Sequence, residues 1–168
     1  MNKHTVLATA AFLPVLAFLA PDLRAQSVEV TPAALAVKAD IVAVGKVSSL
    51  ASRWNGDHSR ILTSVTLSVE QYVKGGTPGQ PLTIVVPGGE VDGVGELYSH
   101  MATFQQGESV LVFAEKDARG NYRVSSGQQG KYTVRKDETT GQLTVGEKMT
   151  LEGMTALVQK AIVDQNQK

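Results

Sequence analysis

The stretch RILTSVTLSVEQYVKG, Arg60 to Gly75, decides the fold class of this chain. Its apolar or β-branched residues stand at every second position and alternate with polar ones: Ile61, Thr63, Val65, Leu67 and Val69. Successive side chains of a β-strand point to opposite faces of a sheet, so this period of two predicts a long strand with one buried face. We therefore expect a mainly β protein.

Strand-like segments continue on both sides of this stretch. The β-branched run IVAVGKVSSL precedes it, and Gly45 within that run marks a bulge or a sharp bend. The alternating PLTIVVP follows it and ends at Pro87, which should stop strand pairing because proline has no N–H. ESVLVFAEKD, YRVSS, KYTVRKD and QLTV complete the set. No helical pattern separates these pieces, which favours antiparallel pairing in a barrel or sandwich.

A helix is expected at each end of the strand region. Thr31 can cap a short helix over 31–39, and Pro32 suits its first turn. A second helix is predicted over 150–164, with Thr150 as its cap. Its apolar stripe consists of Leu151, Met154, Leu157, Val158 and Ile162. The whole pattern fits an antiparallel OB-like barrel of about six or seven strands with a short N-terminal helix and a C-terminal helix.

The first 25 residues have the pattern of a signal peptide. A short basic start leads into an apolar run from Thr5 to Ala20, which Pro14 interrupts, and Ala25 suits the position before the cut. An uncleaved N-terminal anchor is the alternative. We expect export to the periplasm or the outside, one domain over 26–168, and no stable membrane span once the signal has been removed.

The composition of the chain limits the classes of partner that we expect. The chain has 16 basic and 16 acidic residues, and only 5% of its residues are aromatic. Neither a basic stripe nor a base-stacking surface is evident, so we expect no nucleic-acid partner. The absence of cysteine excludes disulfides and a lipid-modified cysteine anchor. The core alone must stabilise the domain.

Three segments together resemble the netrin-like branch of the OB fold, whose best-known member is the N-terminal domain of the tissue inhibitors of metalloproteinases. They are KADIVAVGKVSS, TLSVEQYVKGG and SVLVFAEKDARGNYRVSSG, and the similarity covers Ala36 to Gly127. The resemblance implies the barrel fold. In that family an N-terminal cysteine chelates the protease zinc, and this chain has none, so no functional residue is carried over.

The glycine-rich stretch VVPGGEVDGVGELYSHMATFQQGE, Val85 to Glu108, interrupts the strands. Three interpretations of its Gly88–Glu96 part stay open: a solvated Ω-like connection, a partner-binding segment, or a cation site. Its carboxylates do not follow the register of an EF-type calcium loop, so we expect no metal. The candidate binding residues in this stretch are Glu90, Asp92, Glu96, Tyr98 and His100.

A second candidate patch lies in the polar loop RWNGDHSR between the first two strands. It comprises Arg53, Trp54 and His58. Trp54 could anchor a partner, or it could fold back as a lid on the barrel end. In an OB-like barrel this loop belongs to the elements that line ligand surfaces.

These observations favour a non-enzymatic binding module over an enzyme. It would recognise a protein partner through barrel-end loops, and fold analogy makes an exported peptidase the candidate partner. We expect no cofactor. The alternative is a small exported hydrolase that uses His58 or His100 with a nearby carboxylate. No Gly-x-Ser-x-Gly elbow or zinc-binding His-Glu-x-x-His motif supports that alternative. GQQGKY, Gly127 to Tyr132, is expected to be a bulged hairpin.

Overall fold

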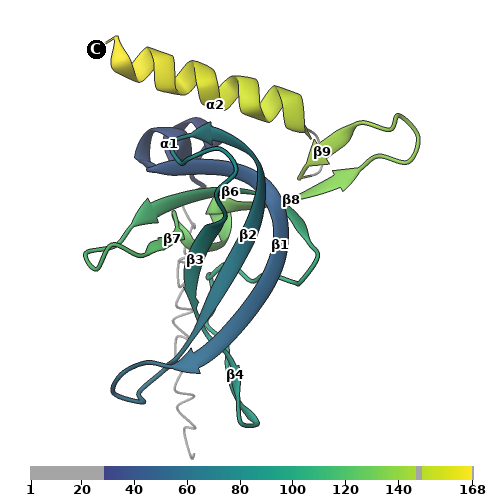
Figure 1. Ribbon diagram of the computed structural model, residues 1–168. Helices are drawn as coiled ribbons and strands as arrows, with labels where there is room; N and C mark the ends of the chain where they lie inside the picture. The colour runs from purple at the N-terminus through teal and green to yellow at the C-terminus, as the bar shows by residue number, and fades with distance from the viewer. Residues whose placement is uncertain (1–28, 147–148, 168) are drawn as a thin grey trace, which may run out of the picture.

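The computed structural model describes residues 29–146 and 149–167 (Figure 1). The expected signal segment and its cleavage point at Ala25 lie outside these residues. The helices and strands, in chain order, are α1 Pro32–Lys38, β1 Ile41–Trp54, β2 Ile61–Lys74, β3 Leu82–Pro87, β4 Gly89–Val91, β5 Val94–Glu96, β6 Ser109–Lys116, β7 Tyr122–Val124, the 3₁₀ helix η1 Gly127–Gly130, β8 Lys131–Lys136, β9 Leu143–Val145, β10 Met149–Thr150 and α2 Leu151–Asn166. None of the described helices is long and apolar enough to cross a membrane.

Five strands close into a barrel. They pair in the order β1-β2-β3-β7-β6, and β6 pairs back onto β1. The sheet continues beyond the barrel from β6 into β8, β9 and β10. The mainly β class with a helix before and after the strands is confirmed. One detail of the prediction is wrong: the pairing of β3 with β7, at Ile84 and Tyr122, is parallel.

The long strands β1 and β2 form the hairpin that dominates the barrel (Figure 1). Burial along β2 alternates from Ile61 to Leu67, as the period of two predicted. The register of β1 against β2 shifts between Val44 and Gly45, which confirms the bulge. A Cβ at Gly45 would lie 2.4 Å from the Ser68 carbonyl oxygen, so only glycine allows the two backbones to approach this closely.

The barrel wall separates two hydrophobic cores. Residues such as Val65, Ile84 and Val112 fill the interior. Phe113 and Val158 belong to the second core, which lies between the outer face of the wall and the two helices. Strand β6 contributes to both cores, and this explains why its centre is apolar on both faces.

The caps of both helices were predicted correctly. Thr31 Oγ1 accepts a hydrogen bond from the N–H of Ala34, and Thr150 Oγ1 accepts one from the N–H of Gly153. Helix α2 lies across α1 (Figure 1). Its buried side chains, Met154 and Val158, pack in the core outside the barrel.

Three local predictions are corrected. Residues 127–130 form the 3₁₀ helix η1 rather than a bulged hairpin, because Ser126 adopts left-handed backbone angles that turn the chain. The segment Gly88–Glu96 is not an irregular connection: it contains the β4–β5 hairpin, with Asp92 and Gly93 at positive φ in its turn. Trp54 is the last residue of β1, paired with Ile61, and is not in the loop.

Candidate functional site

Two hairpins meet at one end of the barrel. The tip of the β1–β2 hairpin and the β4–β5 hairpin project at this end (Figure 1). Ile61 joins them: its carbonyl accepts the N–H of Gly88 at 2.8 Å, and its N–H donates to Glu96 Oε2 at 2.8 Å. We call this region, made of Arg53–Arg60, Gly89–Glu96 and Leu97–Met101, the hairpin end. Glu96 therefore helps to hold the two hairpins together.

A partly buried pair of hydroxyl groups fixes where the β4–β5 hairpin crosses β1 and β2. Thr63 Oγ1 donates to the carbonyl of Gly88 at 2.6 Å and lies 2.9 Å from Ser52 Oγ. Gly89 sits directly above them with φ +132°, and a Cβ there would be 2.3 Å from Thr63 Oγ1. Only glycine fits, so the hairpin lies against the inner face of β1 and β2.

Trp54 and His58 stack on each other at the tip. Their ring centroids are 6.1 Å apart, and the ring planes make an angle of 21°. Trp54 is half-buried and is not among the side chains that pack on the barrel core. Arg53 next to it is exposed. Asn55 Oδ1 accepts the N–H of Ser59 at 2.9 Å and so holds the turn that presents this pair.

An apolar strip follows the β4–β5 hairpin. Its members are Val94, Leu97, Tyr98 and Met101, which are 48%, 85%, 36% and 42% exposed. They are half of the eight large apolar side chains that are exposed in the described residues. Hydrogen bonding of the Tyr98 hydroxyl to Glu96 Oε2, at 3.0 Å, raises the pKa of that tyrosine. Exposed apolar side chains gathered on one segment mark contact surfaces.

His100 anchors the end of this strip by its backbone. Its φ is +64°, and its carbonyl accepts the N–H of Gln128 at 2.9 Å. A Cβ at Gly127 would lie 2.2 Å from the same oxygen, so glycine permits the contact. In residues 29–146 and 149–167, neither the His100 nor the His58 imidazole is hydrogen-bonded to a carboxylate.

The predicted acidic residues do not converge. Glu90 lies on β4 and Asp92 in the turn after it, both exposed, whereas Glu96 is occupied by Ile61 and Tyr98. Among the residues that the structure describes, no three His, Asp or Glu side chains are grouped as metal ligands would be. The predicted residues thus form separate small groups rather than a chelating or catalytic cluster: Trp54 stacks on His58, Glu96 bonds to Tyr98, and the backbone of His100 bonds to Gln128.

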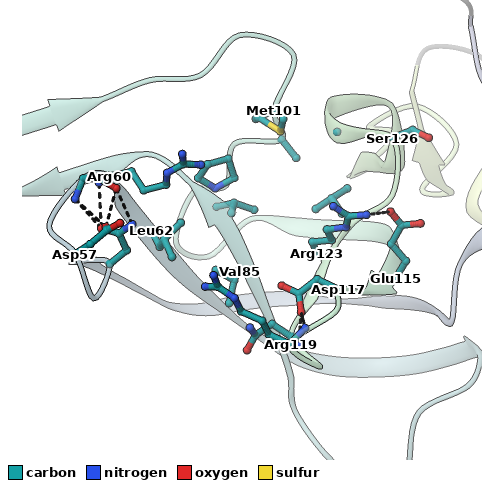
Figure 2. A pocket seen from close by; sticks show the side chains of 18 residues that line it. Asp57, Arg60, Leu62, Val85, Met101, Glu115, Asp117, Arg119, Arg123 and Ser126 are labelled. Carbon is teal, nitrogen blue, oxygen red and sulfur yellow. Dashed lines mark hydrogen bonds and ion pairs between the residues drawn. The ribbon is translucent and has the colours of Figure 1, made fainter.

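A groove of about 710 Å³ adjoins the hairpin end (Figure 2). We call it the arginine groove. The tip, the edges of β2 and β3, and the β6–β7 hairpin line it. Leu62, Val85 and Pro87 supply an apolar floor, and Met101 of the apolar strip lines it as well. Met101 therefore joins the strip to the groove.

Three arginines from separate elements surround this groove. Arg123 pairs with Glu115 at 3.1 Å, and Glu115 also meets Lys38 at 3.3 Å. The guanidinium groups of Arg60 and Arg119 make no ion pair with any described residue. Both side chains are exposed, so a ligand in the groove can reach them.

Two acidic residues of the groove, Asp57 and Asp117, accept hydrogen bonds from residues of their own turns. Asp57 accepts hydrogen bonds from the side chain and backbone of Ser59, and these lower its pKa. Burial alone would raise the pKa of Asp117, but hydrogen bonds from the backbone of Asn121 and Arg119 outweigh it and lower that pKa. Their lone pairs are therefore partly used inside the protein.

Sequence reasoning missed the arginines and most of the strip. Arg60 is far in sequence from Arg119 and Arg123, and they line one groove because β3 pairs with β7, which no local sequence pattern predicts. Leu97 and Met101 carried a weak signal, since they are apolar residues in a polar, glycine-rich segment without period. No protein-family model and no curated protein matches this chain.

Proposed function

We propose that this chain is an exported, non-enzymatic binding module that recognises a protein partner through the hairpin end and the adjoining arginine groove. The observation that carries the proposal is the apolar strip. Leu97 is 85% exposed, and Met101 of the strip lines a groove whose two arginines without an ion pair come from the β1–β2 tip and the β6–β7 turn. An apolar centre with a charged rim is the usual composition of a protein-binding surface.

The strand order supports an OB-like, netrin-like barrel as the finer fold assignment. In the OB fold, the face of strands 2 and 3 and the loops 1–2 and 4–5 hold the ligand. The corresponding parts here are β2, β3, the tip Asn55–Arg60 and the β6–β7 turn, and these line the arginine groove. By fold analogy alone, an exported peptidase remains the candidate partner.

The hydrolase alternative receives less support. A general base needs a partner that orients it, and a nucleophile within hydrogen-bond reach. The His58 ring stacks on Trp54, and in the described residues the His100 ring has no hydrogen-bonded partner. A surface without a nucleophile–base pair is better suited to binding than to acyl transfer.

Site-specific photo-crosslinking tests the proposal. A photoreactive phenylalanine analogue is placed at Leu97 in one variant and at Leu143 in another, and each is expressed in the native envelope. Leu143 is a matched control because it is also an exposed leucine, at 45%, but lies on β9 away from the hairpin end. We expect a discrete protein adduct from position 97 only.

Two further variants separate the hypotheses. Unlabelled protein should compete for the adduct, and its L97S variant should compete at least about tenfold less well, since buried apolar contacts of a central leucine contribute roughly 1.5–3 kcal/mol. The H58A/H100A double variant should still compete for the adduct, because the apolar strip that carries the proposal is intact in it. Equal adducts from both labelled positions, or hydrolase activity that this double variant abolishes, would refute the binding-module proposal.

A further inference from the structure

The outer half of β1 has an open edge. Strand β1 pairs with β2 along its length, but it pairs with β6 only from Ile41 to Lys46. Beyond Val47, no described strand pairs with this side of β1, and the Gln106 side-chain amide donates to the Ser48 carbonyl at 3.3 Å. In Figure 1 this part of β1 forms the outer margin of the long hairpin.

The hydrogen bonds around Ile61 reveal which groups of β1 face outward. Its N–H and C=O both bond away from β1, to Glu96 and to Gly88. Ile61 is paired with Trp54 in the ladder, so this pair is one without mutual hydrogen bonds. The N–H and C=O of Trp54 must therefore also point away from β2.

Alternation carries this orientation along the strand. The register is regular from Ser49 to Trp54, so Ser52 and Leu50 face outward like Trp54. Pro87 gives an independent check: it pairs with Leu62, has no N–H, and so requires the backbone groups of Leu62 to face β1. Three residues thus offer three donors and three acceptors that no described backbone group satisfies.

This edge has neither a proline, nor a lysine, nor a bulge to protect it. Natural edge strands are blunted by proline, by lysine, by bulges or by covering segments. Between Leu50 and Trp54 there is no proline and no register shift, and the single charged side chain is Arg53. Unpaired backbone groups at a strand's spacing are complementary to another extended backbone.

We propose that an extended segment of the partner protein adds to the sheet along β1, antiparallel or parallel to Leu50–Trp54. This inference rests on the proposed function, since it names how the partner's backbone engages the hairpin end. A second copy of this chain fits the edge poorly. A twofold pairing about Ser52 would bring two β4–β5 hairpins, which cross the strand where Gly89 meets Ser52, into the same space.

A short peptide tests the edge directly. The probe is a blocked heptapeptide of alternating threonine and valine, and its control is the fully N-methylated peptide, which keeps the side chains but has no N–H donor. Amide hydrogen exchange is followed by NMR during titration to millimolar peptide. We expect protection at Leu50, Ser52 and Trp54, little change at Ala51 and Arg53, which already bond to β2, and no protection by the control.

One pair of variants separates backbone from side chain. L50P removes an outward N–H without touching the β1–β2 ladder and should weaken the probe roughly fivefold or more, whereas L50A keeps the N–H and should stay within about twofold. If L50P does not fold, the N-methylated control carries the test. The inference would be overturned if the probe protected none of the three amides, or if the N-methylated control bound equally well. Protection that rises with protein concentration in the absence of peptide would overturn it as well.

This outcome is distinguishable from failure of the proposed function. L97S leaves the edge intact, so the probe should protect the same three amides in that variant. If the probe fails while crosslinking at Leu97 succeeds, only strand addition is wrong. If the probe binds while crosslinking fails, the edge accepts an extended peptide, but the proposed protein partner is wrong.

Discussion

A half-buried ion pair holds the connection that carries the apolar strip, and its removal makes a quantitative test. Glu108 Oε1 accepts from Lys131 Nζ and from Thr133 Oγ1, each at 2.6 Å, and Oε2 accepts from the N–H of Gln105 at 3.2 Å. The Glu108 and Lys131 side chains are only 13% and 14% exposed. Lys131 also lies 5.1 Å above the ring of Phe104.

The E108Q variant keeps the shape of the side chain and deletes its charge. The single amide oxygen of Gln can replace only one of the two carboxylate oxygens, so the partners of the other oxygen face an NH₂ group. In either orientation the Lys131 ammonium stays half-buried without an anion. Loss of one charge-assisted hydrogen bond costs about 2 kcal/mol. For a domain of this size the melting temperature should fall by roughly 5–8 °C. Urea unfolding followed by circular dichroism measures the free energy.

A double-mutant cycle separates the pair from the packing. E108Q/K131M removes both charges while retaining the lysine stem's contact with Phe104, so its free energy of unfolding should lie within about 1 kcal/mol of the parent. If E108Q alone costs less than about 0.5 kcal/mol, or if the double variant is as unstable as the sum of the two single variants, the reasoning about a half-buried, coupled pair is refuted.

Four further predictions concern pH, the contact of the β4–β5 hairpin with β1 and β2, and export. Burial alone would raise the pKa of Glu108, but hydrogen bonds from Lys131 and Thr133 outweigh it and hold that pKa below its ordinary 4.5. The stability that ionised Glu108 contributes is therefore present above pH 4.5 and is lost as the pH falls through the lower folded pKa. The E108Q variant should lack this part of the dependence of the unfolding free energy on pH. G89A should cost about 2 kcal/mol because its Cβ would meet Thr63 Oγ1 at positive φ, whereas G95A, with open space around it, should change stability by less than about 0.5 kcal/mol in the same urea assay. T63V should cost about 1 kcal/mol by leaving the Gly88 carbonyl without its donor, which a urea midpoint will also detect. N-terminal sequencing of the chain recovered from the envelope should begin at Gln26, and a chain that still begins at Met1 would favour the uncleaved anchor.

Local chemistry accounts for how much of the fold could be predicted. The period of two from Ile61 to Leu67 requires one solvent-exposed face and one buried face. At position 45, glycine is the only residue type that fits the bulge. Thr31 and Thr150 cap their helices because their hydroxyls replace a missing backbone acceptor. Each of these signals is complete within a few residues. Such signals survive in any tertiary context that keeps the strand or helix.

The rest depends on contacts between distant segments. Strand β7 is three residues long and pairs with β3 at one position, so its closing role depends on packing rather than on pattern. That closure gathers Arg60, Arg119 and Arg123 around one groove. The β4–β5 hairpin was missed because glycines dominate it and its strands have no buried face of their own.

The most direct test of the binding account is a hydrogen-exchange footprint of the chain with the protein captured at Leu97. The account predicts slower exchange in residues 50–60 and 89–101, with β9 and α2 unchanged. Protection confined to β8, β9 or α2, or none at the hairpin end, would contradict it.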